Sequence, residues 1–453
     1  MDLYKKSLRT ACLVLLMLLV WAAGFSFSQD HGVTDAGDAY NILPEKDRQA
    51  VVNSWLKWRL DNILPDIMRR EGIDMWLVIC RENNEPPTFF SMVPRPVMYA
   101  SRTTILIFHD QGPGKGVARL SGGGRGIGTF YKSILNDRNK DPFVNLAEYI
   151  AEADPKKIGV DVSENWGYGD GLTVGLYRQL VKALGPELEK RLVSAEHLSV
   201  GWLETRSPRQ LSVYRHICGI AHDMIAEFFS NKVIVPDMTT TEDVVWWFRQ
   251  KVTDMGLETW FQPSCSIQRS KKDAAKYPQG DRVIRRGDLL HCDVGITYLG
   301  LCTDTQQHAY VCRIGENDAP EGLKEALRKG NRLQDIFMGN FKEGRTGNEV
   351  LRMSREQAIS EGLKPSIYTH PLGVHGHAAG TELGLWDRQE GVPVRGDYPL
   401  HFNTCYSIEL NHTTTVPEWG DQQIRIMLEE DAAFTKEGCR FIDGRMTKFY
   451  LIK

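Results

Sequence analysis

The chain has 453 residues, of which 42% are hydrophobic and 25% are charged, and its formal net charge is −3. This composition is typical of a folded globular protein of two or three domains, and it excludes a mainly disordered chain and a protein with many membrane spans. The near balance of 55 basic and 58 acidic residues gives no indication of a nucleic-acid-binding surface.

The first 28 residues have the pattern of a signal peptide. Three basic residues precede an apolar run over residues 11–23, which is shorter than a membrane span of about 20 residues but typical of a signal-peptide core. Small residues at Ser26 and Ser28 predict cleavage near Ser28, and hence a periplasmic or secreted protein. An uncleaved N-terminal anchor is the alternative. Eight cysteines would remain after cleavage, but their wide spacing does not predict a disulfide scaffold.

Residues 29–203 are predicted to form an N-terminal α/β domain, because strand and helix patterns alternate along this part of the chain. The pattern indicates a helix over 45–72, buried strands near 75–80, 103–108 and 157–162, and helices near 144–153 and 170–184. The glycine-rich stretch 112–128 lacks the spacing of a phosphate-binding loop and is predicted to be a hairpin or a loop.

Residues 204–453 are predicted to form a second domain of the α+β class. A new helix is expected to begin at Ser207-Pro208, since serine is a good N-cap and proline fits the first helical position. Further helices are expected after residue 240 and over 320–340, and strand-rich stretches over 283–314 and 403–436. Helices followed by hairpins are typical of an α+β arrangement.

Two aspartates lie in a predicted hairpin of this second domain. A strand containing Asp293 leads through a turn near 298–299 into a strand that begins at Asp304. Such a turn would place Asp293 directly opposite Asp304 across the ladder. Two carboxylates at that range repel each other unless a cation lies between them, so the hairpin indicates a divalent metal site. Taken alone, the hairpin also fits one turn aspartate and one solvated aspartate.

Further donors follow downstream. His370, His375 and His377 lie within eight residues, and imidazole suits manganese, iron, cobalt or zinc. Glu409 lies in a predicted strand, and Glu429 follows the end of another apolar-rich strand. With the two aspartates these residues provide a mostly oxygen ligand set, which suits two hard cations.

The ordered set Asp293, Asp304, His377, Glu409 and Glu429 resembles the metal ligands of the pita-bread metallopeptidases, which include methionine aminopeptidase, aminopeptidase P and prolidase, with creatinase as a relative without metal. The 11-residue spacing of the aspartates, the His-x-x-Gly pattern from His377, and the stretch 429–438 carry the resemblance. Residues 72–77 resemble the creatinase/prolidase N-terminal domain. The resemblance therefore covers essentially the whole mature chain and favours the two-domain aminopeptidase P and prolidase branch. It implies a pita-bread catalytic domain over 204–453 after a creatinase-type α/β domain.

The resemblance implies a hydrolase with two divalent metal ions, with manganese as the first expectation and cobalt, zinc or iron as alternatives. Asp293 would chelate one ion, and Asp304 and Glu429 would bridge both. His377 and Glu409 would bind the other ion. A hydroxide held between the ions would attack the scissile carbonyl, and Glu409 would also move the proton. The retention of all five ligands argues against creatinase chemistry.

The expected substrate pocket departs from the family pattern in three places. Prolidase-like members carry a second histidine about seven residues after the metal histidine, but seven residues after His377 stands Gly384. An earlier histidine is missing, and residues 274–278 offer Lys276 and Tyr277 instead. The arginine that commonly follows the second aspartate is replaced near Gln306-Gln307.

These departures leave the role of the other two histidines open. His375 is predicted to be a catalytic residue beside Glu409, making substrate or oxyanion contacts; His370 could do the same, and both could be structural. The expected function is an exopeptidase that acts at the N-terminal residue of short peptides, with Xaa-Pro bonds as a candidate. The alternatives are a pseudo-peptidase that only binds peptides and a hydrolase of a non-peptide C–N bond. The expected partner is a peptide, without nucleic acid or membrane, and a homodimer is compatible with the family.

Overall fold

A computed structural model describes residues 41–125, 127–135 and 139–453. The predicted signal peptide lies outside the described residues. None of the described helices combines the length and the apolar character that crossing a membrane requires. Residues 43–453 form one unit of continuous contacts, so the predicted domain limits at 203 and 204 stay a prediction. All eight cysteines among the described residues are free.

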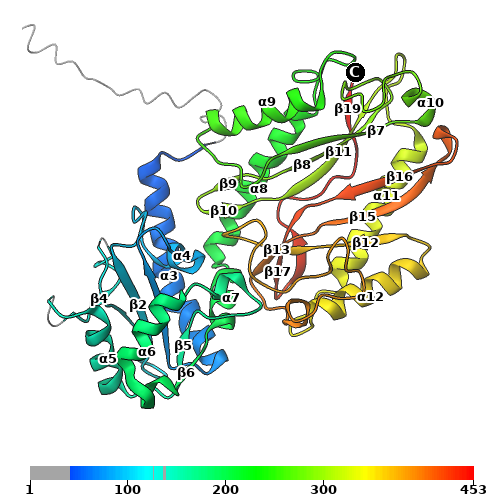
Figure 1. Ribbon diagram of the computed structural model, residues 1–453. Coiled ribbons are helices and arrows are strands. Elements are labelled where there is room, and N and C mark those ends of the chain that lie inside the picture. Colours follow the sequence, from blue (N-terminus) through cyan, green and yellow to red (C-terminus); the bar gives the residue numbers. More distant parts are fainter. Residues whose placement is uncertain (1–40, 126, 136–138) are drawn as a thin grey trace, which may run out of the picture. The chain divides into compact units, whose positions relative to one another are not determined.

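A six-stranded sheet occupies the first half of the described chain (Figure 1). Its strand order is β4-β3-β2-β1-β5-β6, formed by β1 (Met75–Arg81), β2 (Thr103–Asp110), β3 (Val117–Ser121), β4 (Lys132–Ser133), β5 (Ile158–Val160) and β6 (Leu192–Ser194). The helices of this region are α3 (Glu45–Glu71), α4 (Pro87–Met92), α5 (Pro142–Ala153), α6 (Val174–Glu189) and α7 (Glu196–Glu204), with the 3-10 turn η1 (Gly167–Gly169).

The central strand β1 shows why this sheet forms. Trp76, Val78 and Cys80 pack into one buried cluster, whereas the alternate side chains of Met75, Leu77 and Ile79 pack into another. A strand buried on both faces reads as a continuous apolar run, as it does here. The prediction of an α/β arrangement is confirmed for this sheet, and the glycine-rich stretch contains the expected hairpin strand β3.

The second half of the chain contains two four-stranded sheets, one three-stranded sheet and a short two-stranded ribbon among the described residues. The strands are β7 (Ser264–Gln268), β8 (Leu289–Val294), β9 (Thr297–Tyr298), β10 (Leu301–Cys302), β11 (Thr305–Val311), β12 (Pro365–Ile367), β13 (His370–Leu372), β14 (Thr404–Ser407), β15 (Leu410–Val416), β16 (Gln422–Leu428), β17 (Asp431–Thr435), β18 (Gly438–Phe441) and β19 (Tyr450–Ile452). Their orders are β19-β11-β8-β7, β12-β15-β16 and β13-β14-β17-β18, with β10-β9 as the ribbon.

Helices pack against these sheets (Figure 1). They are α8 (Pro208–Phe228), α9 (Thr241–Asp254), α10 (Lys271–Ala274), α11 (Glu321–Gly339) and α12 (Gly347–Ser360), with 3-10 turns η2 (Arg395–Asp397) and η3 (Pro417–Trp419). Helix α8 begins as predicted, with Ser207 and Gln210 forming a capping box. Leu323 and Leu327 of α11 share a buried cluster with Leu410 of β15 and Ile426 of β16. Burial of this helix stripe against strands confirms the α+β class.

The aspartate hairpin differs from the prediction by its register. Asp293 of β8 lies opposite Gln306 of β11, so the predicted direct opposition of Asp293 and Asp304 is wrong. The chain reverses at Leu299 and Gly300, whose φ angles of 54° and 73° suit a two-residue hairpin turn, one residue beyond the predicted position. Asp304 is nevertheless the diagonal neighbour of Asp293 on the same face, because side chains alternate along a strand.

Candidate metal centre

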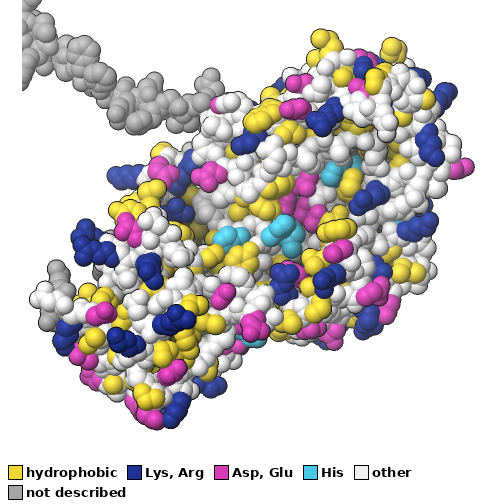
Figure 2. All heavy atoms as spheres, viewed as in Figure 1, with side chains coloured by type: hydrophobic (Ala, Val, Ile, Leu, Met, Phe, Trp, Pro, Cys, Tyr) yellow, Lys and Arg dark blue, Asp and Glu magenta, His cyan; other side chains and the backbone are white. Residues whose placement is uncertain are grey.

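The candidate ligands come from strands or strand ends that are far apart in the sequence. Asp293 lies near the end of β8, and Asp304 directly precedes β11. His370 begins β13, Glu409 lies between β14 and β15, and Glu429 lies between β16 and β17. Figure 2 shows acidic and histidine side chains gathered together in the middle of one face of the protein.

The structure brings these side chains into three overlapping groups. In each group the donor atoms all lie within 4.8 Å of one another, and the groups are Asp293–Asp304–Glu429, His370–Glu409–Glu429 and Asp304–His370–His377. Asp304, His370 and Glu429 each belong to two groups. Shared carboxylates between neighbouring groups are the arrangement that two adjacent cations require.

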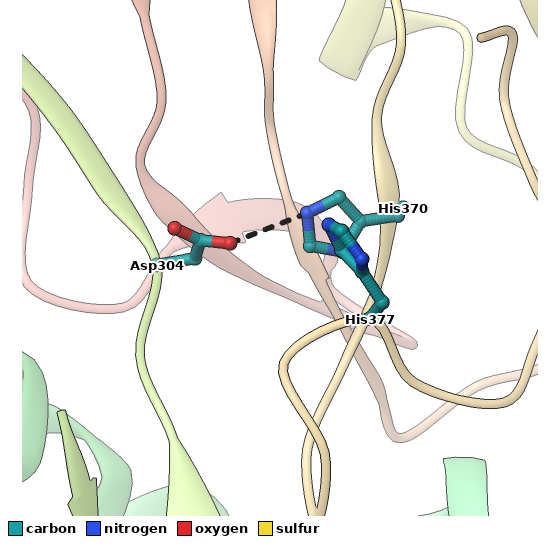
Figure 3. A group of neighbouring side chains, drawn as sticks. All are labelled: Asp304, His370 and His377. Atoms are coloured by element: carbon teal, nitrogen blue, oxygen red, sulfur yellow. Dashed lines mark ion pairs between the residues drawn. The ribbon is translucent and has the colours of Figure 1, made fainter. Parts of the chain in front are cut away.

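His370 lies at the centre of the cluster and belongs to two of the three donor groups, whereas the sequence predicted His377 as the imidazole ligand. Its Nε2 lies 3.4 Å from Asp304 Oδ2 and 3.5 Å from Glu429 Oε1, and its side chain is 12% exposed. Figure 3 shows the ring pointing toward Asp304. Nδ1 lies 2.9 Å from the carbonyl oxygen of Pro371. A proton on Nδ1 donated to that carbonyl leaves the Nε2 lone pair for a cation.

His377, the imidazole ligand predicted from the sequence, lies at the edge of this cluster. It joins only the group with Asp304 and His370, its side chain is exposed, and its ring centroid is 4.6 Å from that of His370. The signal for His370 was present in the sequence, because His370 and Gly373 also fit the His-x-x-Gly pattern. In that alignment His377 stands where the family pattern expects a second histidine, seven residues after the first.

The indole ring of Trp260 packs beside His377, and the sequence analysis did not predict this contact. The two ring centroids are 5.3 Å apart, and Trp260 Nε1 donates a hydrogen bond of 2.8 Å to the carbonyl oxygen of Thr303, next to Asp304. A Cβ at Gly376 would overlap the indole ring, so this close approach requires glycine. The signal was a glycine between two histidines, which by itself does not identify its partner.

His375, the predicted catalytic histidine, belongs to none of the three groups found among the described residues. Its ring lies 5.0 Å from that of Tyr168 in η1, and the Tyr168 hydroxyl donates to the carbonyl oxygen of His377. Burial lowers the pKa of His375, and its buried Nδ1 has no hydrogen-bond partner in the described structure. Tyr168, which precedes His377 by 209 residues, therefore supports the loop that carries His375 and His377, here called the histidine loop. Local sequence patterns do not reveal this contact. A catalytic role of His375 stays a prediction.

The electrostatics of the cluster fit bound cations. Burial, followed by repulsion from Glu429, raises the pKa of Asp293 to about 8 and that of Glu409 to about 9. The same causes raise the pKa of Asp304 well above its ordinary value. Burial opposes a charge on His370, but Asp304 and Glu429 outweigh it and raise the pKa of the ring. Cations would relieve this repulsion and reverse the carboxylate shifts.

Two buried atoms of the cluster also indicate a place for a cation. Asp304 Oδ1 and His370 Nε2 lack a hydrogen-bond partner in the described structure, although buried polar atoms normally have one. A mostly carboxylate donor set with one imidazole suits Mn²⁺, Fe²⁺, Co²⁺ or Zn²⁺. The residues present therefore fit a pair of divalent metal ions.

Known proteins share this architecture. The family described as metallopeptidase family M24 matches residues 212–441. A curated relative, the uncharacterized peptidase YqhT of Bacillus subtilis (strain 168), is 25% identical over 163 residues, which are 36% of this chain and 41% of that protein. The match thus spans less than half of the relative's length.

Solved structures show the fold over most of the chain. The X-Pro aminopeptidase of Thermotoga maritima MSB8 aligns with a TM-score of 0.59 and 17% identity, covering 85% of this chain and 99% of that one. The Xaa-Pro dipeptidase of Bacillus anthracis aligns with a TM-score of 0.57 and 16% identity, covering 87% and 99%. These alignments confirm the expected pita-bread fold. Together with the family match over half of the sequence, they show that the chain belongs to metallopeptidase family M24.

Proposed function

We propose that the protein is an exopeptidase that depends on two divalent metal ions and cleaves short peptides at the N-terminal residue, with Xaa-Pro bonds as the first candidates. The sharing of Asp304 and Glu429 between neighbouring donor groups carries this proposal, because two carboxylates that belong to adjacent groups could help to hold two neighbouring cations. Membership of a metallopeptidase family supports a peptide as the substrate. The names of the two structural neighbours motivate the choice of Xaa-Pro peptides.

The ligand assignment follows the geometry of the three groups. Asp293, Asp304, Glu409 and Glu429 would hold the two ions together with His370, which replaces His377 as the imidazole ligand in this proposal. The bound ions would supply Lewis acidity toward the scissile carbonyl and lower the pKa of a nucleophilic water.

The remaining residues would orient the substrate and move its proton. Glu409, half-buried at the edge of the cluster, would hold the proton of the attacking water and pass it to the leaving amine. His377, exposed beside His370, would donate a hydrogen bond to the peptide carbonyl. Trp260 and Tyr168 would form walls on either side of the histidine loop and exclude water.

The decisive experiment compares metal content with hydrolysis. Purified residues 29–453 would be stripped with a chelator, reloaded with Mn²⁺, Co²⁺, Zn²⁺ or Fe²⁺, and assayed on dipeptides and on Xaa-Pro peptides. We expect about two ions per chain, with hydrolysis that is lost on chelation and restored by metal. Asp304→Ala should lose metal and activity together, whereas Asp387→Asn, at an exposed loop position, should retain both.

Three outcomes would contradict the proposal. A folded protein that binds no divalent metal at neutral pH would end it. A metal-loaded protein that is inert toward the whole peptide panel would favour a peptide-binding pseudo-peptidase, and turnover of N-acyl or cyclic amides alone would favour a non-peptide C–N hydrolase.

The leader motivates a second part of the proposal, which is that the protein is exported. A basic start, a short apolar core and small residues near Ser28 support cleavage and release into the periplasm or the medium. N-terminal sequencing of the protein from fractionated cells should find a chain that begins close to residue 29. Recovery of the intact leader in the membrane fraction would indicate an anchor instead.

A further inference from the structure

Gln306 occupies a position between two of the proposed ligands. Its Nε2 lies 2.5 Å from Glu409 Oε1 and 2.7 Å from Glu429 Oε2, and its side chain is buried. Both protons of the amide are therefore donated to carboxylates. The donor is neutral and reaches two acidic groups at once.

His291 holds the other end of the same amide. His291 Nε2 lies 2.9 Å from Gln306 Oε1, and the His291 ring is buried on β8. Because the amide nitrogen of Gln306 faces two carboxylates, its oxygen must face His291, and the ring must carry its proton on Nε2. His291 Nδ1 then faces the hydroxyl of Ser266 at 3.4 Å. The network thus assigns one orientation of Gln306 and one tautomer of His291.

The neighbouring glutamine provides a matched comparison. Gln307 points to the opposite face of β11, donates to Glu430 at 2.7 Å, and accepts from the Tyr450 hydroxyl at 3.0 Å. Both glutamines are buried, both lie on one strand, and each donates to one of two consecutive glutamates. Only Gln306 contacts proposed metal ligands.

We propose that His291 and Gln306 form a positioning pair that holds Glu409 and Glu429 in the arrangement required by two divalent cations. This inference rests on the proposed metal function of the site. The amide offsets the repulsion between the two carboxylates, and each contacted oxygen keeps a second lone pair for an ion. The hydrogen bond from His291 prevents Gln306 from turning its oxygen toward the glutamates. Groups that orient ligands in this way contribute to metal affinity without touching the ion.

The test measures binding of Mn²⁺ alone by calorimetry, on chains whose folding is checked by circular dichroism. Gln306→Met keeps the shape and removes the donor, so we expect Mn²⁺ affinity to fall roughly 10- to 100-fold while two sites remain. His291→Phe should cause a loss in the same direction, and His291→Gln, which restores a donor, should recover affinity to within about threefold. Gln307→Met should bind Mn²⁺ like the unaltered chain.

The outcomes separate this inference from the proposed function. An unaltered chain that binds no Mn²⁺ would refute the metal function itself. An unaltered chain that binds two ions, with Gln306→Met and His291→Phe equal to it, would overturn only the positioning role. Equal losses in His291→Gln and His291→Phe would also overturn it, because a merely structural effect of His291 is not rescued by a new donor. If Gln306→Met does not fold, the two His291 variants decide the matter. The visible spectrum of the Co²⁺ form supplies a second readout, which should change in Gln306→Met and not in Gln307→Met.

Discussion

The backbones of Gln306 and Glu429 hydrogen-bond to each other in both directions, with N···O distances of 3.0 and 3.1 Å. This isolated bridge joins the start of β11 to the segment that follows β16, although the two residues are 123 positions apart. It brings Glu429 next to Asp304. Glu429 can therefore belong both to the group with Asp293 and Asp304 and to the group with His370 and Glu409. The proposed metal centre therefore depends on a contact between strands of different sheets.

The two histidines beside Asp304 should respond differently to substitution. His370→Ala should lower Mn²⁺ affinity by at least tenfold and reduce hydrolysis accordingly, because His370 belongs to two donor groups. His377→Ala should keep about two ions and instead lower kcat/KM, since His377 is exposed at the edge. Metal analysis and steady-state kinetics on the same preparations distinguish the two. Loss of metal in His377→Ala with retention in His370→Ala would reverse the assignment.

Metal binding should release protons at neutral pH. Without metal, burial and the repulsion from Glu429 raise the pKa of Asp293 to about 8 and that of Glu409 to about 9, and the carboxylates Asp304 and Glu429 raise the pKa of His370, so each group holds its proton to a higher pH than a free side chain does. The groups must lose these protons to act as ligands, so Mn²⁺ affinity should rise as the pH increases from 6 to 9. Calorimetry in buffers of different ionisation enthalpy measures the proton release directly. An affinity independent of pH over this range would contradict the raised pKa values.

A methyl group at Gly376 should displace Trp260. The Cβ of Gly376→Ala would overlap the indole ring, which cannot move without losing its hydrogen bond to Thr303. We expect a stability loss of about 1–3 kcal/mol and a lower kcat/KM at unchanged metal content. Gly339→Ala is the matched control, since nothing lies within 4 Å of its Cβ. Thermal unfolding and kinetics give both readouts, and a Gly376→Ala enzyme that behaves like the control would exclude this packing role.

Tyr168 should affect substrate binding more than metal binding. Its ring packs on His375, and its hydroxyl donates to the carbonyl oxygen of His377. Tyr168→Ala should raise KM several-fold because the histidine loop loses its brace, while the Mn²⁺ content stays constant. Tyr168→Phe removes only the hydrogen bond and should raise KM by a smaller factor. The loss of substrate-binding free energy should be about 0.5–1.5 kcal/mol. A fall in Mn²⁺ content in either variant would place Tyr168 among the supports of the metal ions instead.

Much of the architecture was readable from local patterns. The continuous apolar run of β1 predicts a strand buried on both faces, and Ser207-Pro208 predicts the start of α8, because both signals depend only on neighbouring residues. The acidic ligand candidates could be predicted because the order and spacing of two aspartates and two later glutamates resemble the metal ligands of the pita-bread metallopeptidases. The structure brings all four carboxylates together.

The identity of the central histidine required the fold. His370 and His377 both begin a His-x-x-Gly pattern, so their sequences do not distinguish them. The pairing of β13 with β14 places His370 opposite Ser407, whose hydroxyl donates to Glu429, and this contact selects His370. The partnership of His291 with Gln306, and the two-residue shift that sets Gln306 opposite Asp293, are also consequences of strand register. Residue types and their spacing along the chain thus specify the kind of chemistry. Strand pairing decides which side chains meet, because its free energy is summed over contacts between segments that are separated in the sequence, by as much as 123 positions for Gln306 and Glu429.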